Sequence, residues 1–458
     1  MSSSLVARSL SRMRAIVAQA THKPGEPSQK ELVRIRKQLE ECAAELGGEV
    51  STRQRAAQLA DTYLRLDENG RRAMLKMIAL DFGPDPQAIA KAHAAYQETI
   101  GSDSQWEAEA QLRMAMRSKR LRILTQFNAI PQGVKFLVDL RADLLRFAAN
   151  DPLLKPLDRE LETRFAAWFD VGFLELQRIT WESPAALLER LVKYEAVHAI
   201  SSWQDLKNRL DSDRRCYAFF HPRMPLEPLI FVQVALTESL ADNVQRLLDI
   251  RAPLGNATKA DTAIFYSITS SQAGLRGVSF GNFLLKRVID DLQRDFTRLR
   301  TFSTLSPIPG LIRWVKQNPQ NLSLAFTASD WKKLTPEGVP REMNQLIAFL
   351  ADDAEWTKRD SLASALQTPL MRLAAHYLVK VRHGEYPADS VARFHLGNGA
   401  QIERLNWLAD TSEKGFAQSW GMMVNYLYDL DHLEENIEAY ARDGRIYTSS
   451  AVRKQAKI

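Results

Sequence analysis

The sequence predicts an α+β protein, in which an all-helical N-terminal bundle domain (residues 1–200) precedes an α/β domain (residues 201–458). From residue 29 onward, apolar residues recur at intervals of three and four positions, as they do in amphipathic helices. After Trp203, short runs of β-branched and aromatic residues alternate with helical patterns. The length of 458 residues also exceeds what one hydrophobic core usually supports, so two domains are expected.

The first half contains a series of helical patterns separated by helix breakers. The first pattern, SQKELVRIRKQLEECAAEL, begins with Ser28 as a candidate N-cap, and Gly83-Pro84, Ile130-Pro131 and Asn150-Asp151-Pro152 interrupt the later ones. Short connections predict antiparallel neighbours in a bundle. Nothing in this half is typical of a catalytic site, so we interpret it as a packing or oligomerisation scaffold. It has more amphipathic helices than a small bundle can bury, which predicts a homo-oligomer, either a dimer or a tetramer.

Composition argues against several classes of protein. Lys and Arg total 61 against 55 Asp and Glu, but they are spread along the helical patterns, so we expect no nucleic acid partner. No stretch of eighteen consecutive apolar residues predicts a membrane span. The two cysteines, Cys42 and Cys216, are far apart, and the histidines show no HExxH or HxH arrangement. We therefore expect neither a disulfide framework nor a metal site.

The N-terminus leaves two locations open. Its first twenty residues are rich in Ser and Arg and contain no acidic residue, which is typical of a mitochondrial transit peptide or of a basic helix or tail. We favour the helix or tail and therefore a cytoplasmic protein, with mitochondrial location as the alternative.

The second half begins with three candidate strands, at residues 215–222, 228–237 and 262–270. A glycine-containing loop, an amphipathic helix and the strand-like TFSTLS follow the third of them. Strand, loop, helix and strand in this order predict a crossover unit within a mixed sheet.

The loop before the amphipathic helix carries Gly277 and Gly281, four residues apart. Glycines between a strand and a helix N-terminus suit a bound pyrophosphate, although a plain turn would also explain them. The pattern is neither a P-loop nor a dinucleotide-binding fingerprint. It is similar to the Arg/Gln-x-x-Gly-x-Gly/Ala loop of acetyl-CoA-dependent N-acetyltransferases, which holds the coenzyme A pyrophosphate. An acyltransferase is therefore one interpretation.

The stretch TFSTLSPIPG places Ser306 directly before Pro307, and Pro309 follows. Proline fixes its own φ and favours extended geometry in the residue before it, so Ser306 is expected on a stiff, non-helical backbone. A serine before proline is more often a turn hydroxyl than a catalytic group, so this motif does not by itself predict chemistry.

A longer set of motifs resembles the malonyl-CoA decarboxylase family. These motifs are FYSITSSQAGLRGVSFGNFLLKRVIDDLQRDF, FSTLSPIPG, ALQTPLMRLAAHYL, FHLGNGAQIERLNWLAD and GMMVNYLYDL, and they follow one another across roughly residues 265–430. The resemblance implies a catalytic acyl-CoA-binding domain with the acetyl-CoA-dependent N-acetyltransferase fold, with malonyl-CoA as substrate and acetyl-CoA as product. It also implies an oligomer built partly from the helical domain. The family's peroxisomal C-terminal tripeptide is missing, because the chain ends Gln-Ala-Lys-Ile.

The resemblance also implies site residues. The family's catalytic serine corresponds to Ser306 and its catalytic histidine to His395. Its substrate loop and one further contact correspond to Arg276, Gly277, Val278, Ser279, Phe280, Gly281, Asn282 and Leu285. The family has a glutamate where this chain has Ser279, so any role of that carboxylate does not carry over. Ser267 and Tyr428 lie in similar stretches and are candidate supporting residues.

The implied reaction converts malonyl-CoA to acetyl-CoA and carbon dioxide. The thioester carbonyl accepts the electrons released by decarboxylation, so no metal or organic cofactor is required. We assign His395 as proton donor or relay and Ser306 as the hydroxyl that polarises the carboxylate or the carbonyl. Which residue contacts which oxygen stays open. The alternatives are an acyl-CoA-dependent acyltransferase and a non-catalytic acyl-CoA-binding scaffold. We interpret His221 as structural, and Trp407 and Trp420 as core residues.

Overall fold

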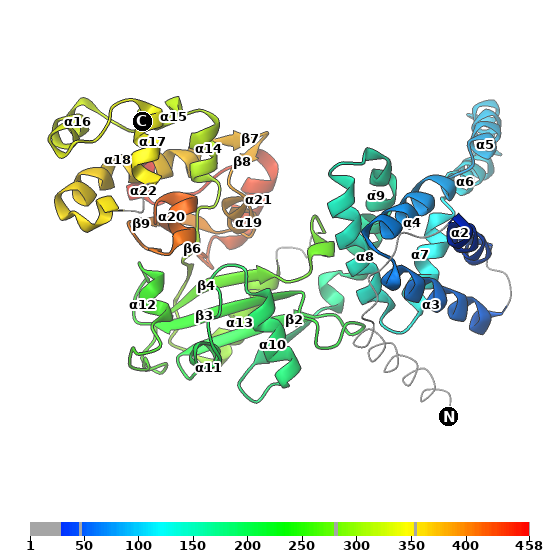
Figure 1. Cartoon of the computed structure of the whole chain (residues 1–458), viewed down its shortest axis with the longest axis horizontal. Coiled ribbons are helices and arrows are strands. Elements are labelled where there is room, and N and C mark those ends of the chain that lie inside the picture. Colours follow the sequence, from blue (N-terminus) through cyan, green and yellow to red (C-terminus); the bar gives the residue numbers. More distant parts are fainter. Residues whose placement is uncertain (1–28, 45–47, 279–282, 352–354, 458) are drawn as a thin grey trace. The chain divides into compact units, whose positions relative to one another are not determined.

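The computed structural model of the chain describes residues 29–44, 48–278, 283–351 and 355–457. They form two compact units, which are coloured along the sequence in Figure 1. The helical unit comprises Met1–Leu174, His221–Pro225 and Gln272–Phe280, and the sheet unit comprises Glu175–Phe220, Leu226–Ser271 and Gly281–Ile458. The predicted order of an all-helical region followed by a mixed sheet is confirmed. The observed boundary, however, falls after Leu174 and not at residue 200.

The helical unit is built from short helices whose ends follow the predicted breakers. Its helices are α2 (Gln29–Ala43), α3 (Glu49–Arg65), α4 (Glu68–Asp81), α5 (Pro86–Thr99), α6 (Gln105–Ala115), α7 (Arg120–Ala129), α8 (Gly133–Ala148), η1 (Pro152–Leu154), α9 (Lys155–Trp168) and η2 (Val171–Phe173). Asp67 caps α4 by accepting a hydrogen bond from Gly70 N at 2.7 Å, and Pro86 occupies the first turn of α5. The predicted cap Ser28 lies outside the described residues.

The sheet has the strand order β1-β2-β3-β4-β5-β10-β6, and β9 also pairs with β10. These strands are β1 (Glu175–Ile179), β2 (Arg214–Phe220), β3 (Ile230–Thr237), β4 (Thr262–Ser270), β5 (Thr301–Thr304), β6 (Ser306–Pro307), β9 (Gln401–Asn406) and β10 (Met423–Leu427). Strands β2, β3 and β4 coincide with the three predicted strands. Only the β4–β5 pair is parallel among the strand pairs of the described chain, and α13 (Phe283–Asp295) connects its two strands. The predicted crossover unit is therefore present.

The remaining elements of the sheet unit are mostly helical. They are α10 (Ala185–Tyr194), α11 (Trp203–Arg209), α12 (Val244–Leu248), α14 (Leu311–Gln317), α15 (Gln320–Ser323), α16 (Ala328–Leu334), η4 (Thr335–Glu337), α17 (Met343–Ala351), η5 (Glu355–Lys358), α18 (Asp360–Lys380), β7 (Arg382–His383), β8 (Tyr386–Pro387), α19 (Ser390–Gly397), α20 (Glu413–Ser419), α21 (Leu433–Asp443) and α22 (Ser450–Gln455). The short helix η3 (Ala273–Leu275) belongs to the helical unit.

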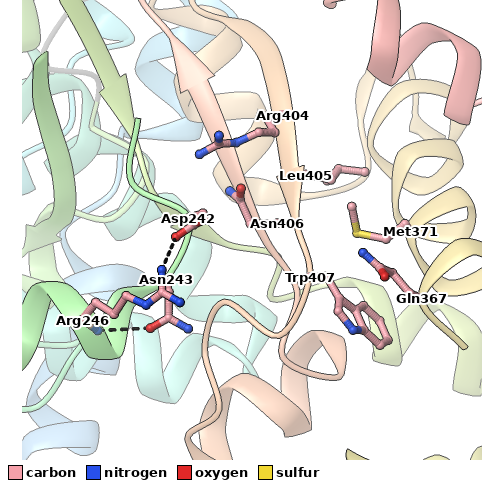
Figure 2. A pocket seen from close by; sticks show the side chains of 9 residues that line it. All are labelled: Asp242, Asn243, Arg246, Gln367, Met371, Arg404, Leu405, Asn406 and Trp407. Carbon is pink, nitrogen blue, oxygen red and sulfur yellow. Dashed lines mark hydrogen bonds and ion pairs between the residues drawn. The ribbon is translucent and has the colours of Figure 1, made fainter. Parts of the chain in front are cut away.

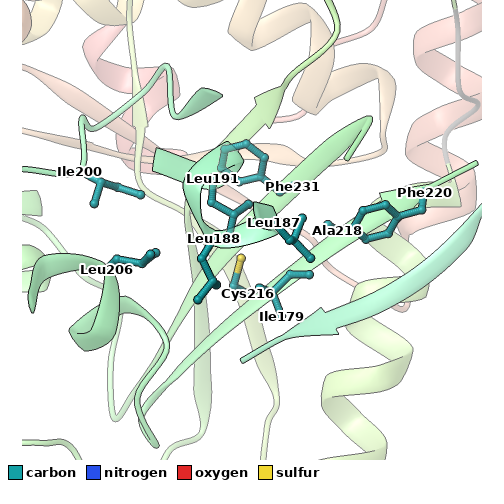
Figure 3. Packing of buried hydrophobic residues seen from close by; sticks show 10 residues of the cluster. All are labelled: Ile179, Leu187, Leu188, Leu191, Ile200, Leu206, Cys216, Ala218, Phe220 and Phe231. Atoms are coloured by element: carbon teal, nitrogen blue, oxygen red, sulfur yellow. The ribbon is translucent and has the colours of Figure 1, made fainter. Parts of the chain in front are cut away.

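Strand β1 and helix α10 explain why the boundary differs from the prediction. Leu187, Leu188 and Leu191 of α10 pack against Cys216 and Ala218 of β2 in one buried cluster (Figure 3). This apolar face of α10 is therefore buried by the sheet, and the segment belongs to the sheet unit. Strand β1 fell within the region predicted to be helical, because it lacks the alternation of apolar and polar residues that indicates a strand. Four of its five residues are exposed or half-buried.

The two faces of the sheet are covered by different elements. Cys216 and Ala218 point toward α10, whereas Phe219 points toward α13, where Arg287 lies 5.6 Å from the centre of its ring. Farther along the α10 face, Leu305 and Met423 belong to a buried cluster with Val244 and Leu247 of α12. Because side chains alternate between the faces of a strand, Ser306 and Val424 point to the opposite face from Leu305 and Met423.

Candidate active site

Ser306 is the first residue of β6 and is almost completely buried. Its strand pairs with β10 through Val424, and Pro307 pairs with Met423. Leu305 interrupts the ladder between β5 and β6, so the serine lies just beyond a break in regular pairing. As the sequence predicted, Ser306 has extended backbone geometry and two prolines after it.

His395 approaches Ser306 from helix α19. Its Nε2 atom lies 3.1 Å from Ser306 Oγ, and its Nδ1 atom lies 2.7 Å from the hydroxyl of Tyr428. The imidazole stacks on the ring of Tyr426 with a centroid distance of 4.6 Å and an interplanar angle of 23°. Residues 89 positions apart in the sequence are thus brought into direct hydrogen-bonding contact.

Thr304 extends this contact into a chain of four polar side chains: Tyr428, His395, Ser306 and Thr304. The hydroxyls of Thr304 and Ser306 are 2.9 Å apart, and Tyr426 N donates to Thr304 Oγ1 at 3.1 Å. In one proton arrangement, Tyr428 donates to Nδ1, Nε2–H donates to Ser306, and Ser306 donates to Thr304. This is the arrangement that matches the direction of the hydrogen bond from Ser306 to Thr304.

Burial determines the protonation states of the His395 and Tyr428 side chains. It lowers the pKa of His395 from 6.5 to about 3 and raises the pKa of Tyr428 well above its usual value. At neutral pH the imidazole is therefore uncharged and the phenol protonated. The four side chains therefore form an uncharged, hydrogen-bonded series of three hydroxyls and one imidazole.

The predicted substrate loop is described only in part. Arg276, Gly277 and Val278 belong to the helical unit, where the buried guanidinium of Arg141 donates to the carbonyls of Gly274 and Arg276, each at 2.9 Å. Gly277 has a φ of +84°, a left-handed conformation that favours glycine. Four predicted loop residues lie outside the described residues: Ser279, Phe280, Gly281 and Asn282.

Three other predicted residues have different environments. Leu285 is buried in α13. Ser267 donates its hydroxyl proton to the buried carboxylate of Glu195 at 2.9 Å, not to Ser306 or His395. His221 has a backbone partner at each ring nitrogen: Nε2 lies 3.1 Å from Trp168 O, and Nδ1 accepts from Arg223 N at 3.1 Å. This arrangement agrees with the structural role predicted for His221.

A pocket of about 350 Å³ is lined by residues of α12, α18 and β9 (Figure 2). Arg404 and Asn406 of β9 line it, and both donate to Asn425 Oδ1, at 3.0 and 2.8 Å. Arg404 also donates to the carbonyls of Leu240 and Ala241, so this guanidinium ties β9 and β10 to the preceding loop. The polar side chains of Arg404 and Asn406 at this pocket are therefore engaged in structural hydrogen bonds.

Trp407 borders this pocket, whereas Trp420 is fully buried. The prediction that both are core residues therefore describes Trp420 fully and Trp407 in part. Within the described ranges, no group of three or more His, Cys, Asp or Glu side chains is arranged to hold a metal ion, and no helix is long and apolar enough to cross a bilayer. Cys42 and Cys216 are buried and unpaired.

The fold and this site define a class: a two-unit α+β protein whose mixed sheet carries a buried, neutral serine–histidine pair. Comparisons with known proteins identify the family. The model of the malonyl-CoA decarboxylase C-terminal domain matches residues 172–458, and that of the N-terminal domain matches residues 82–169. The chain therefore belongs to the malonyl-CoA decarboxylase family, and the prediction of an enzyme, a carboxy-lyase, is confirmed.

Individual relatives agree with this assignment. The mitochondrial malonyl-CoA decarboxylase of Anser anser anser is 37% identical over 415 residues, which are 87% of this chain and 82% of the relative. Crystal structures of malonyl-CoA decarboxylases from Rhodopseudomonas palustris and Agrobacterium vitis are 40% and 39% identical, with TM-scores of 0.82 and 0.83. Each comparison covers 93% of this chain and all of the crystallised chain.

Thr304 and Tyr426 are site residues that the sequence did not predict. A signal for Thr304 was present, because it lies two positions before Ser306 in the strand-like TFSTLS, a spacing that places side chains on one face.

Proposed function

We propose that this protein decarboxylates malonyl-CoA to acetyl-CoA and carbon dioxide, and that Ser306 and His395 carry out the chemistry without a metal or organic cofactor. The observation that supports this proposal most strongly is the buried contact of 3.1 Å between Ser306 Oγ and His395 Nε2, in a chain that belongs to the decarboxylase family.

The reaction breaks the bond between C2 and the carboxylate of the malonyl group. The electron pair moves into the thioester carbonyl to form an enolate, and carbon dioxide leaves. The enolate then takes one proton at C2, so each turnover consumes one proton. Neutral donors in a water-poor site favour this sequence, because they stabilise the developing oxyanion while the departing carboxylate loses its hydration. The thioester itself is the electron sink.

The proposed catalytic roles of Ser306 and His395 follow from the uncharged, hydrogen-bonded series of side chains. The hydroxyl of Ser306 polarises the carboxylate or the thioester carbonyl. His395 delivers the proton, directly or through Ser306, from Nε2, while its Nδ1 accepts the proton of Tyr428, which lies 2.7 Å away. The tyrosinate formed in this step then takes up a proton from solvent, which closes the cycle. This relay keeps the imidazole uncharged throughout, in keeping with the low pKa of about 3 that burial gives it.

We also propose that the loop Arg276–Asn282, with Leu285, binds the coenzyme A portion of the substrate. Support comes from the glycine spacing, from the left-handed Gly277 and from the bonds by which Arg141 holds the start of the loop. Position 279 is a serine, so the loop lacks the carboxylate that the family resemblance implies there.

The helical unit is proposed to mediate homo-oligomerisation, as a dimer or tetramer. Helix α5 has no buried residue, and four large apolar side chains of the adjoining segment are exposed: Ile100, Trp106, Met114 and Met116. A second copy of the chain would cover them. We retain the cytoplasmic location as a prediction; the names of the animal relatives, which are mitochondrial, keep the alternative open.

Substitution of the pair tests the mechanism. Ser306→Ala and His395→Ala are each expected to lower kcat at least about a hundredfold, the usual loss when an acid–base or oxyanion group is removed. Ser271→Ala is the matched control, because Ser271 Oγ donates only to Pro228 O, outside the catalytic chain. Near-normal turnover in a folded Ser306→Ala or His395→Ala variant would show that the residue has no catalytic role.

A further inference from the structure

Asp389 is a completely buried carboxylate that contacts both segments of the candidate active site. It is the N-cap of α19, the helix that carries His395, and its Oδ1 atom accepts from Val391 N and Ala392 N, each at 3.0 Å. Its second oxygen, Oδ2, accepts from Gly310 N at 3.1 Å. Gly310 lies four residues after Ser306 on the same segment.

The second contact distinguishes Asp389 from an ordinary cap. Asp85, which caps α5, accepts from Gln87 N and Ala88 N through Oδ1, and both bonds are local to its own helix. Asp389 makes the same two local bonds and adds one to a residue 79 positions away. One carboxylate thus joins the start of the histidine helix to the end of the serine segment.

The segment from Ser306 to Gly310 and the helix from Asp389 to His395 are both short and stiff. Between Ser306 and Gly310 lie Pro307, Ile308 and Pro309, and two of these three residues have a fixed φ. His395 lies six residues after Asp389 within a continuous helix. A displacement at either end of the link is therefore carried to the contact between Ser306 and His395 and is not absorbed by a flexible loop.

The surroundings of Gly310 leave no space for an alternative arrangement. A β-carbon at this position would lie 2.0 Å from the hydroxyl of Tyr377 and 3.1 Å from Asp389 Oδ2. Burial and the neighbouring Asp389 carboxylate raise the pKa of the Tyr377 phenol. Burial raises the pKa of Asp389, and its three backbone N–H donors act in the opposite direction.

We propose that Asp389 is a positioning residue that holds the Ser306 segment and the His395 helix at their working distance. This inference rests on the proposed catalytic roles of those two residues. Asp389 contacts neither the serine nor the histidine side chain in the structure; it acts through the segments that carry them.

Two substitutions separate the capping bonds of Asp389 to α19 from its bond to Gly310, which links the two segments. Asp389→Ser keeps a capping oxygen for Val391 N and Ala392 N but is too short to reach Gly310, whereas Asp389→Ala loses both functions. If the link positions the pair, both variants lower kcat at least about tenfold, because small displacements of reacting groups are costly. The KM for malonyl-CoA should stay within about twofold of the wild-type value in both. Asp85→Ser is the matched control and should leave kcat unchanged.

The pH profile provides a readout that lost stability alone would not move. The ring of His395 faces Ser306, Tyr426, Tyr428 and Phe394, and none of these is charged. A loosened helix admits water, so the pKa of His395 rises from about 3 toward 6.5, and the acid limb of kcat moves to higher pH in Asp389→Ser. A variant that is merely less stable keeps the wild-type profile at lower amplitude.

Several results would overturn the proposal. If Asp389→Ser keeps the wild-type kcat and Asp389→Ala lowers it, Asp389 acts only as a helix cap. If both variants keep the wild-type kcat, Asp389 has no positioning role. If Asp389→Ser fails to fold, the isosteric Asp389→Asn replaces it. Its single oxygen should stay with the two capping donors, so the same kcat loss is expected, and wild-type kcat would contradict the link. Ser306→Ala, assayed in parallel, identifies a failure of the catalytic assignment itself: full turnover there means that the pair, not the link, was misassigned.

Discussion

At the scale of single residues, the central feature is an imidazole that burial keeps uncharged. His395 is surrounded by Tyr426, Tyr428 and Ser306, and its pKa of about 3 lies well below the 6.5 of an unperturbed histidine. The unfolded chain therefore binds a proton at this residue between about pH 6.5 and pH 3, whereas the folded chain does not. Folding stability must fall as the pH decreases through this window.

This linkage predicts a measurable loss of stability. Between pH 7 and pH 5, the wild type should lose about 2 kcal/mol more unfolding free energy than His395→Gln, because the variant lacks the group that titrates only in the unfolded state. Urea denaturation at the two pH values provides the measurement. The other titratable groups are common to both proteins and cancel. An equal loss in both would mean that His395 is not buried as a neutral group.

The site was predictable from sequence only where residues are recognisable by their local context. Ser306 stands out by its two following prolines, and His395 by its resemblance to a family motif. Asp389 resembles any helix cap in the sequence, because its distinguishing bond goes to Gly310, and a contact across 79 residues leaves no local signal. Ser267 shows the converse: it lies in a family-like stretch, yet its hydroxyl binds Glu195.

At the scale of elements, Arg141 of α8 organises the segment that leads into the glycine loop. Its guanidinium is almost fully buried, donates to the carbonyls of Gly274 and Arg276, and pairs with Asp158 at 2.8 Å. Arg141→Met should therefore lower the unfolding free energy by about 3 kcal/mol, since it leaves a part-buried carboxylate and two carbonyls without their donor.

The same substitution should raise the KM for malonyl-CoA if the loop binds coenzyme A, because the start of the loop loses its support. Arg113→Met is the matched control. Arg113 pairs with Glu109 on the exposed surface of α6, so its loss should change stability by less than about 0.5 kcal/mol. Thermal and urea denaturation compare the two variants. Equal stability of both would show that Arg141 does not anchor this segment.

Helices and strands were predictable wherever the spacing of apolar residues was clear. The predicted domain boundary was misplaced where a strand had few buried residues. Strands β2, β3 and β4 are fully buried or nearly so, and their β-branched and aromatic residues gave a strong signal. Strand β1 pairs only with β2 in the described sheet, and most of its side chains are exposed or half-buried. Its pattern therefore lacked the apolar alternation on which the prediction depended.

At the scale of the whole molecule, the exposed apolar side chains around α5 and α6 predict self-association. Light scattering on the reduced protein at micromolar concentration should give the mass of a dimer or a tetramer. Oxidising conditions should not change that mass, because Cys42 and Cys216 are buried and unpaired. A monomeric mass would contradict the proposed role of the helical unit.

The measurement that tests the central claim most directly is the product balance from malonyl-CoA alone. The protein, treated with a chelator and given no acyl acceptor, is incubated with malonyl-CoA in D₂O, and carbon dioxide and acetyl-CoA are quantified. The proposed mechanism predicts one carbon dioxide for each acetyl-CoA, with one solvent deuteron at C2 introduced by the enzyme. An acyltransferase would release no stoichiometric carbon dioxide without an acceptor, and a non-catalytic binding protein would leave malonyl-CoA intact. Either result would contradict decarboxylation by this protein.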